Sequence, residues 1–172
     1  MFFVEDPVLF GWSVRRWLAG IGVACVLVLA FGLYLQEVKG LEPCPMCIVQ
    51  RYAFIFIAAC ALLASTTAKK SLQNFGLVAV GIGALAGAGV AARQSWLQWY
   101  PPAVASCGRD FYSMIEDFPL SRAIPMIFRG SGDCSAVDWT FLGGSIANWA
   151  FIVFVVHALL AGILLARGMR RH

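Results

Sequence analysis

Four long apolar stretches limit what this chain can fold into more than any other feature of its sequence. A helix needs about 20 mostly apolar residues to cross the ~30 Å of hydrocarbon in a bilayer. The stretches cover residues 17–35, 52–68, 72–92 and 149–166. The chain is 60% apolar and 13% charged, whereas soluble domains average roughly 45–50% apolar and about 25% charged residues. We therefore expect an all-α integral membrane protein, a bundle of four transmembrane helices.

We expect one membrane domain that takes in the whole chain, residues 1–172. Its spans should run over about residues 15–36, 47–67, 72–94 and 146–166, joined on one side by loops at about 37–46 and 95–145. The lipid bilayer is then the main surrounding of the protein. The net charge of +4 is too small to favour nucleic-acid binding, so no nucleic acid partner is expected.

The basic residues predict the orientation of the spans. Cytoplasmic segments next to membrane helices carry an excess of Lys and Arg. Seven of the 13 basic residues fall in the N-terminal segment, the turn between the second and third spans, and the C-terminal tail: Arg15, Arg16, Lys69, Lys70, Arg167, Arg170 and Arg171. Four spans bring these segments to one side, which predicts cytoplasmic N- and C-termini.

Small residues repeat every four positions along the third span, at Ala79, Gly83, Gly87 and Ala91. In membranes such a pattern allows a neighbouring helix to approach closely. We expect this face to contact the rest of the bundle.

The six cysteines divide by depth. Cys25 and Cys60 lie inside apolar spans, where a cysteine behaves as a small buried hydrophobe. The other four lie in the two outer loops: Cys44, Cys47, Cys107 and Cys134. An even number of cysteines facing an oxidising compartment indicates disulfides. Cys44 with Cys47 is the obvious first pair, which leaves Cys107 with Cys134.

Structural disulfides and a zinc site are alternatives to redox chemistry for these four cysteines. A C-x-x-C disulfide closes a very short ring and so constrains the unfolded chain little. A zinc ribbon requires two such motifs, whereas Cys107 and Cys134 are far apart without a nearby His. The pattern therefore favours redox-active cysteines and no metal.

The surroundings of Cys47 favour a reactive thiolate. Pro43 and Pro45 should prevent a helix before Cys47, so we expect the second span to begin at or just after this residue. Unpaired N–H groups and the dipole at a helix N-terminus stabilise negative charge. Arg51 lies one turn further on the same face, although an arginine here could also simply reach to the membrane interface. Both effects would lower the pKa of the Cys47 thiol.

Together, these motifs resemble the disulfide bond formation protein B (DsbB) family of bacterial inner membranes. The resemblance covers nearly the whole chain. It includes the four spans, the C-x-x-C before the second span, Arg51, residues 97–101, Cys107, residues 130–134, Trp139 and residues 141–143. The chain departs from some family members, which carry a histidine where Gln94 stands, so we expect no proton-transfer role there.

The resemblance implies a multi-pass enzyme of the bacterial cell inner membrane with two periplasmic loops. Such a protein-disulfide:quinone oxidoreductase reoxidises the periplasmic thiol oxidase DsbA and passes two electrons to a membrane quinone, ubiquinone or menaquinone. By resemblance, Cys107 forms the mixed disulfide with DsbA. Cys134 then attacks the Cys44–Cys47 pair and joins Cys44. Cys47 engages the quinone, which Arg51 helps to bind.

Two other functions remain open at this stage. One is a quinone-coupled thiol oxidoreductase similar to vitamin K epoxide reductase, with another thioredoxin-like partner. The other is a non-catalytic four-span membrane protein with structural disulfides. Between Cys107 and Cys134, apolar residues alternate with polar ones, which fits either a short helix on the membrane surface or a loop with apolar anchors.

Overall fold

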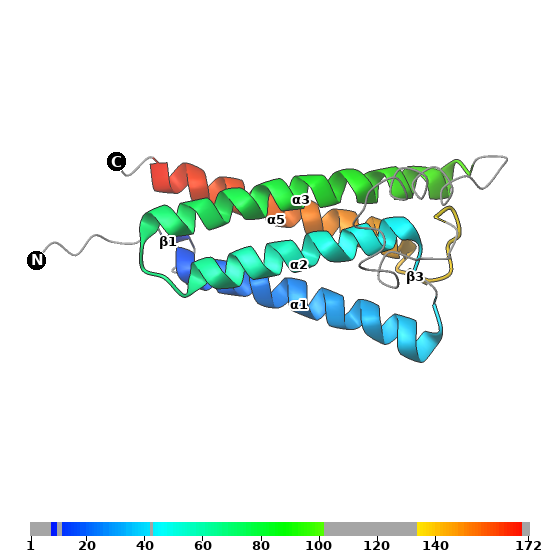
Figure 1. The fold of residues 1–172 in the computed structure, drawn as a ribbon. Helices are drawn as coiled ribbons and strands as arrows, with labels where there is room; N and C mark the ends of the chain where they lie inside the picture. The colour runs from blue at the N-terminus through cyan, green and yellow to red at the C-terminus, as the bar shows by residue number, and fades with distance from the viewer. Residues whose placement is uncertain (1–7, 10–11, 42, 102–133, 170–172) are drawn as a thin grey trace, which may run out of the picture.

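A computed structural model describes residues 8–9, 12–41, 43–101 and 134–169 of the chain. Four long helices make up most of it: α1 (Val14–Lys39), α2 (Pro45–Ser65), α3 (Lys70–Trp99) and α5 (Ile146–Met169) (Figure 1). All four are long and apolar enough to cross a membrane. The expected all-α membrane fold with four helices is therefore confirmed.

Two short antiparallel strand pairs, which the sequence analysis did not predict, lie beside the helices. β1 (Val8–Leu9) pairs with β2 (Trp12–Ser13) just before α1. β3 (Thr140–Phe141) pairs with β4 (Gly144–Ser145) just before α5. The second hairpin turns through Leu142 and Gly143, both with positive φ, and brings the chain from Cys134 back to the start of α5.

Successive helices run in opposite directions, so the bundle has two distinct ends (Figure 1). The start of α1, the turn between α2 and α3 and the end of α5 share one end. Arg15, Lys69, Lys70 and Arg167 lie there, and Arg15 Nε donates to the Ser65 carbonyl at 3.0 Å. The turn between α1 and α2 and the β3–β4 hairpin lie at the opposite end.

Helix α3 is the most enclosed of the four. Half of the residues in its apolar 18-residue stretch are buried, against 22–33% in the corresponding stretches of the other helices. A side chain at Gly83 would collide with Phe56 of α2, and one at Gly87 would collide with Phe154 of α5. The predicted contact face of small residues is confirmed, because it lets α2 and α5 pack closely on two sides of α3.

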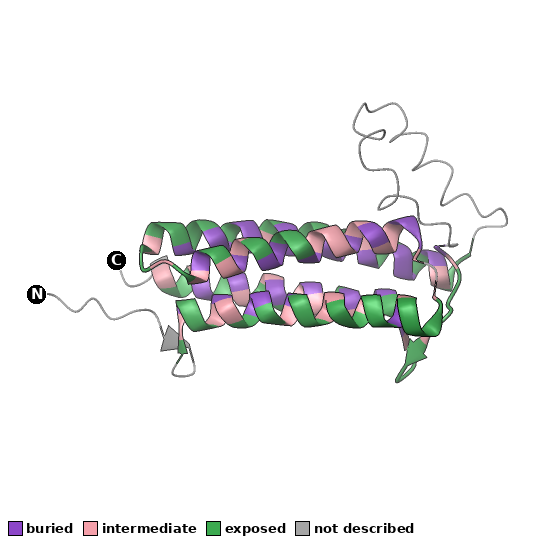
Figure 2. Cartoon of the chain, turned by 60° about the horizontal axis from the view of Figure 1, so that its bottom comes forward, coloured by how far each residue is buried: buried purple, intermediate pink, exposed green. Residues whose placement is uncertain are grey.

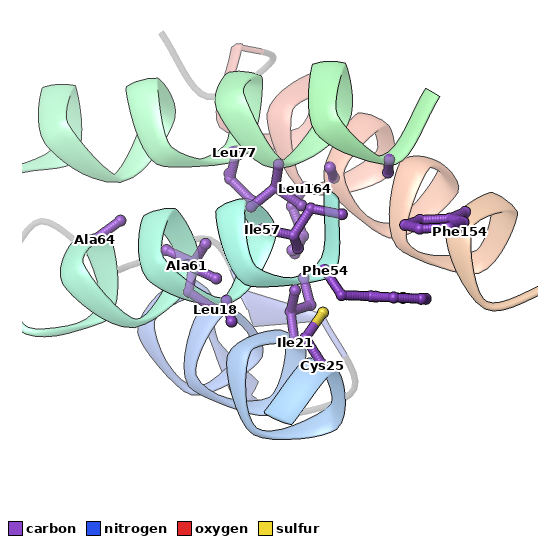
Figure 3. Packing of buried hydrophobic residues seen from close by; sticks show 14 of the residues in the cluster. Leu18, Ile21, Cys25, Phe54, Ile57, Ala61, Ala64, Leu77, Phe154 and Leu164 are labelled. Atoms are coloured by element: carbon purple, nitrogen blue, oxygen red, sulfur yellow. The ribbon is translucent and has the colours of Figure 1, made fainter. Parts of the chain in front are cut away.

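The core between the helices is built from interlocking apolar side chains (Figure 3). The rings of Phe54 and Phe154 stack with centroids 4.0 Å apart and an angle of 11° between planes. Leu18, Ile57 and Leu77 are fully buried around them. Lipid tails are as apolar as these side chains, so van der Waals packing rather than exclusion from water holds such helices together.

The exposed faces of the helices, green in Figure 2, also carry many large apolar side chains. Leu27, Leu63, Phe75 and Ile82 are all more than 60% exposed. Such a surface suits hydrocarbon and not water. This arrangement, apolar both inside and outside, is that of a multi-pass membrane protein.

Candidate functional site

The turn between α1 and α2 delivers Cys44 to one end of the bundle. Helix α1 stops at Gly40, which adopts the left-handed conformation with φ of 67°. Its N–H bonds the Leu35 carbonyl, and the Leu41 N–H bonds the same oxygen at 3.4 Å. Glycine takes up this conformation at low cost. The chain can therefore reverse within a few residues and begin α2.

Cys44 caps the N-terminus of α2. Its backbone is extended, and its Sγ accepts a hydrogen bond from the Cys47 N–H at 3.3 Å. The expectation that α2 begins at or after Cys47 is wrong, because the helix already begins at Pro45. Proline is well tolerated as the first residue of a helix, where its missing N–H has no partner to lose. Cys47 still lies within the first turn, near the unpaired N–H groups.

Three cysteines from two distant segments of the chain meet at this position. Cys134 is fully buried and packs with Cys44, Cys47 and Leu97. Cys44 Sγ lies 3.1 Å from Cys47 Sγ. Hydrogen bonds to Cys134 and Cys47, together with burial, raise the pKa of the Cys44 thiol above its usual value. Cys107 and the apolar residues after it, for which a surface helix and an anchored loop were both open, lie outside the described residues.

The Cys134 segment is tied to the ends of α3 and α5. Gln98 Nε2 donates to the Ala136 carbonyl at 3.3 Å, and Ser145 Oγ donates to Gln98 Oε1 at 2.6 Å. Ser145 also caps α5, since its Oγ accepts from the Asn148 N–H at 3.3 Å. These contacts hold the segment that follows Cys134 against the bundle.

Two buried glutamines lie beside the cysteines. Gln94 Nε2 is 3.2 Å from Cys47 Sγ and 3.3 Å from Cys44 Sγ. Gln50 Nε2 donates to Gln94 Oε1 at 2.6 Å. Neither residue was predicted from the sequence to be part of the site, although Gln94 stands where some family members carry a histidine. The available signal for Gln50 was an amide side chain next to Arg51 in a predicted membrane span, since a buried amide requires a partner.

Arg51 lies on the α1 side of the site. Its Nη1 donates to Gln36 Oε1 at 2.7 Å and its Nη2 to the Gly32 carbonyl at 3.4 Å. The sequence spacing suggested an arginine directed at the thiol. In the structure these hydrogen bonds go to α1, while Arg51 and Cys47 line the same cavity.

This cavity has a volume of about 390 Å³, within the range of roughly 300–1,000 Å³ typical of sites for small molecules. α1 and α5 form two of its walls, and polar groups come from α2, the end of α3, Gln36 of α1 and the segment that contains Asp138 and Ser145. Its polar lining includes Cys44, Cys47, Gln50, Arg51 and Gln94, whereas most other lining residues are apolar, among them Phe31, Phe54, Trp149 and Val153. Among the described residues, no group of three His, Cys, Asp or Glu side chains could hold a metal ion.

Fold and site together define a multi-pass membrane protein with a cysteine cluster beside a largely apolar cavity. A family model described as "Disulfide bond formation protein DsbB" matches residues 14–164. Two relatives named "Disulfide bond formation protein B" come from Acidovorax sp. (strain JS42) and Albidiferax ferrireducens. They are 65% and 60% identical over 160 and 167 residues, covering 91% and 95% of this chain and 90% and 96% of the relatives.

A third relative of the same name, from Paracidovorax citrulli, is 62% identical over 157 residues, 91% of this chain and 89% of its own. The chain belongs to the DsbB family. It is therefore an oxidoreductase of disulfide bond formation, which sets aside the alternatives of a relation to vitamin K epoxide reductase and of a non-catalytic membrane protein.

Proposed function

We propose that this protein reoxidises a DsbA-like periplasmic thiol oxidase and transfers the two electrons to a membrane quinone, ubiquinone or menaquinone. The observation that carries the proposal is the continuous arrangement of sulfur atoms from Cys134 through Cys44 to Cys47, which ends at an apolar cavity. Thiol–disulfide exchange requires such direct approach of sulfur to sulfur.

The exchange begins at the outer loops. A thiolate of the reduced partner attacks the Cys107–Cys134 disulfide at Cys107 and releases Cys134 as a thiolate. The partner's second thiolate then attacks the mixed disulfide, so the partner leaves oxidised and Cys107 is released. Two electrons and two thiol protons have passed from the partner to this protein and its solvent.

The second exchange takes place within the described residues. The Cys134 thiolate attacks Cys44 Sγ of the Cys44–Cys47 disulfide, the Cys44–Cys47 bond breaks, and Cys47 keeps the electron pair as a thiolate. The contact between Cys134 and Cys44 supports Cys44 as the sulfur that is attacked. Cys107 then displaces Cys44 from Cys134, which restores the outer disulfide.

The cavity fits a quinone in size and in lining. A bound quinone would accept two electrons and two protons. Cys47 would present its sulfur to the ring, and Arg51 would donate to a ring carbonyl from a guanidinium that carries a permanent charge. Gln36 and the Gly32 carbonyl hold that guanidinium in place. The apolar walls on α1 and α5 would receive the ring and tail from the bilayer.

We propose the bacterial inner membrane as the location, with the basic end of the bundle in the cytoplasm and the cysteine end in the periplasm. This orientation is supported by Arg15, Lys69, Lys70 and Arg167 at one end and by Cys44, Cys47 and Cys134 at the other.

The test is the quinone-dependent reoxidation of a reduced DsbA-type protein, with each cysteine replaced by serine in turn. We expect Cys44→Ser, Cys47→Ser, Cys107→Ser and Cys134→Ser to lose turnover. Cys25→Ser and Cys60→Ser serve as matched controls inside the bundle and should retain it. Normal turnover without Cys47, or without Cys134, would overturn the proposal.

A further inference from the structure

Gln50 and Gln94 form a buried amide pair between α2 and α3, next to the C-x-x-C motif. Gln50 is 4% exposed and Gln94 is 3% exposed. A buried amide without a hydrogen-bond partner costs free energy. The pair meets part of its hydrogen-bonding requirement through the bond of 2.6 Å from Gln50 Nε2 to Gln94 Oε1. The remaining polar atoms of Gln94 face sulfur.

The contact with Gln50 decides which end of the Gln94 amide faces the cysteines. An amide oxygen accepts hydrogen bonds and an amide nitrogen donates them. Because Gln94 Oε1 accepts from Gln50, its Nε2 is directed at Cys47 Sγ and Cys44 Sγ, at 3.2 and 3.3 Å. Gln94 Oε1 is farther from Cys47 Sγ, at 3.7 Å. The end of the amide nearer to the sulfur atoms is therefore the donor.

We propose that Gln94 is a catalytic residue that stabilises the thiolate of Cys47 by donating a hydrogen bond to it, and that Gln50 is a positioning residue that orients the Gln94 amide. This inference rests on the proposed function, in which opening of the Cys44–Cys47 disulfide by Cys134 leaves the electron pair on Cys47 Sγ. Gln94 Nε2 donates a hydrogen bond to this negatively charged sulfur, from a side chain that is itself buried.

A neutral amide suits this place because it stabilises an anion without adding a charge to the membrane-facing cavity. Preorganised donors act strongly where the local dielectric is low. The first turn of α2 acts in the same direction through its unpaired N–H groups. Within the part of the chain that the structure describes, the ionisable groups around Cys47 are Cys44 and Cys134 in the cysteine cluster, with Arg51 and Asp138 lining the same cavity. Gln94 itself does not titrate.

The test measures the pH dependence of Cys47 alkylation by iodoacetamide in the reduced, full-length protein, in lipid nanodiscs without quinone or partner. Peptide mass spectrometry reports Cys47 separately from the other cysteines. Gln94→Leu removes the donor while keeping the volume similar. The midpoint should move up by roughly one to two pH units, since hydrogen bonds to charged groups are among the stronger ones.

Gln50→Leu should raise the midpoint by less, because Gln94 remains but is free to turn. The double variant should match Gln94→Leu alone, since Gln50 acts only through Gln94.

Gln73→Leu is the matched control. Gln73 is also a glutamine of α3 that is 4% exposed, and its Nε2 donates to the Thr67 carbonyl at 2.9 Å at the opposite end of the bundle. Its loss should leave the Cys47 midpoint unchanged. An unchanged midpoint in Gln94→Leu, or additive shifts in the double variant, would overturn the inference.

This assay is independent of electron transfer. If the midpoints shift as expected but the wild-type protein fails to oxidise its partner with quinone, the proposed function is wrong and thiolate stabilisation by Gln94 stands. If turnover is normal and the midpoints do not shift, the proposed function stands and the role of Gln94 is wrong.

Discussion

Two cysteines of this bundle each lie beside a polar side chain, in very different surroundings. Cys25 lies inside α1, where its Sγ is 3.7 Å from His157 Nε2 of α5. Cys47 lies in the first turn of α2, 3.2 Å from Gln94 Nε2 of α3. His157 Nδ1 is 2.6 Å from the Val153 carbonyl. Because a carbonyl only accepts, a neutral ring carries its proton on Nδ1, and the Cys25 thiol donates to Nε2.

In this bundle the position of a cysteine, more than the presence of a polar neighbour, sets what it can do. The neighbour of Cys25 is a histidine whose other ring nitrogen bonds a backbone carbonyl, whereas the neighbour of Cys47 is an amide whose nitrogen faces the sulfur. Cys47 also has two further sulfur atoms in contact and lines a cavity. Cys25 is fully buried in the apolar core. Among the described residues, no other cysteine bonds it, and it does not line the cavity.

Replacing Arg51 should give the largest effect that leaves all cysteines in place. Arg51→Leu removes the guanidinium from the cavity and should raise the apparent KM for quinone by roughly 10–150-fold, given about 1.5–3 kcal/mol for a hydrogen bond to a charged group. Steady-state kinetics with varied quinone concentration measure this. Gln36→Leu loosens the guanidinium without removing it, and its effect should be smaller.

An equal KM in Arg51→Leu and wild type would show that the cavity beside Cys47 does not select the acceptor through this charge. The contrast between the two cysteines would then rest on the sulfur cluster and Gln94 alone.

Replacing Gln98 should have a moderate effect. Gln98→Leu breaks the bonds to the Ala136 carbonyl and Ser145 Oγ, which hold the segment after Cys134 against the bundle. Exchange between Cys134 and Cys44 should slow by about 2–10-fold, since a neutral hydrogen bond contributes about 0.5–1.5 kcal/mol. Stopped-flow reduction of the Cys44–Cys47 disulfide measures this rate.

The alkylation midpoint of Cys47 serves as the internal control for Gln98→Leu. It should not change, because the Gln98 side chain bonds Ala136 and Ser145, and within the described residues no side-chain hydrogen bond joins it to Gln50 or Gln94. A slower exchange accompanied by a shifted midpoint would mean that the substitution disturbs the whole cysteine end.

The sequence predicted the four helices well because a lipid environment leaves the backbone few alternatives to helix. The small-residue face of α3 was also predictable, since close helix contact requires Gly83 and Gly87. The start of α2 was misjudged because a proline was treated as a helix breaker, although Pro45 is the first residue of the helix.

The contacts of the site were harder to predict, since they join distant segments. The Gln50–Gln94 pair links residues 44 positions apart, and the bond between Arg51 and Gln36 depends on how α1 packs on α2. Local spacing placed Arg51 near Cys47 but could not give the direction of its guanidinium. Such directions follow from the packing of helices and not from the periodicity within one helix.

The smallest effect is expected at His157, and it tests the other half of the comparison. His157→Leu removes the contact with Cys25 and keeps an apolar side chain between α1 and α5. Interhelical hydrogen bonds in membranes average only about 0.6 kcal/mol, so the free energy of unfolding in mixed detergent should fall by about that amount or less. Turnover should stay near the wild-type value, because Cys25 and His157 lie outside the lining of the cavity. A large loss of turnover with normal stability would mean that this buried pair takes part in electron transfer, and Cys25 could then no longer serve as the inert counterpart of Cys47.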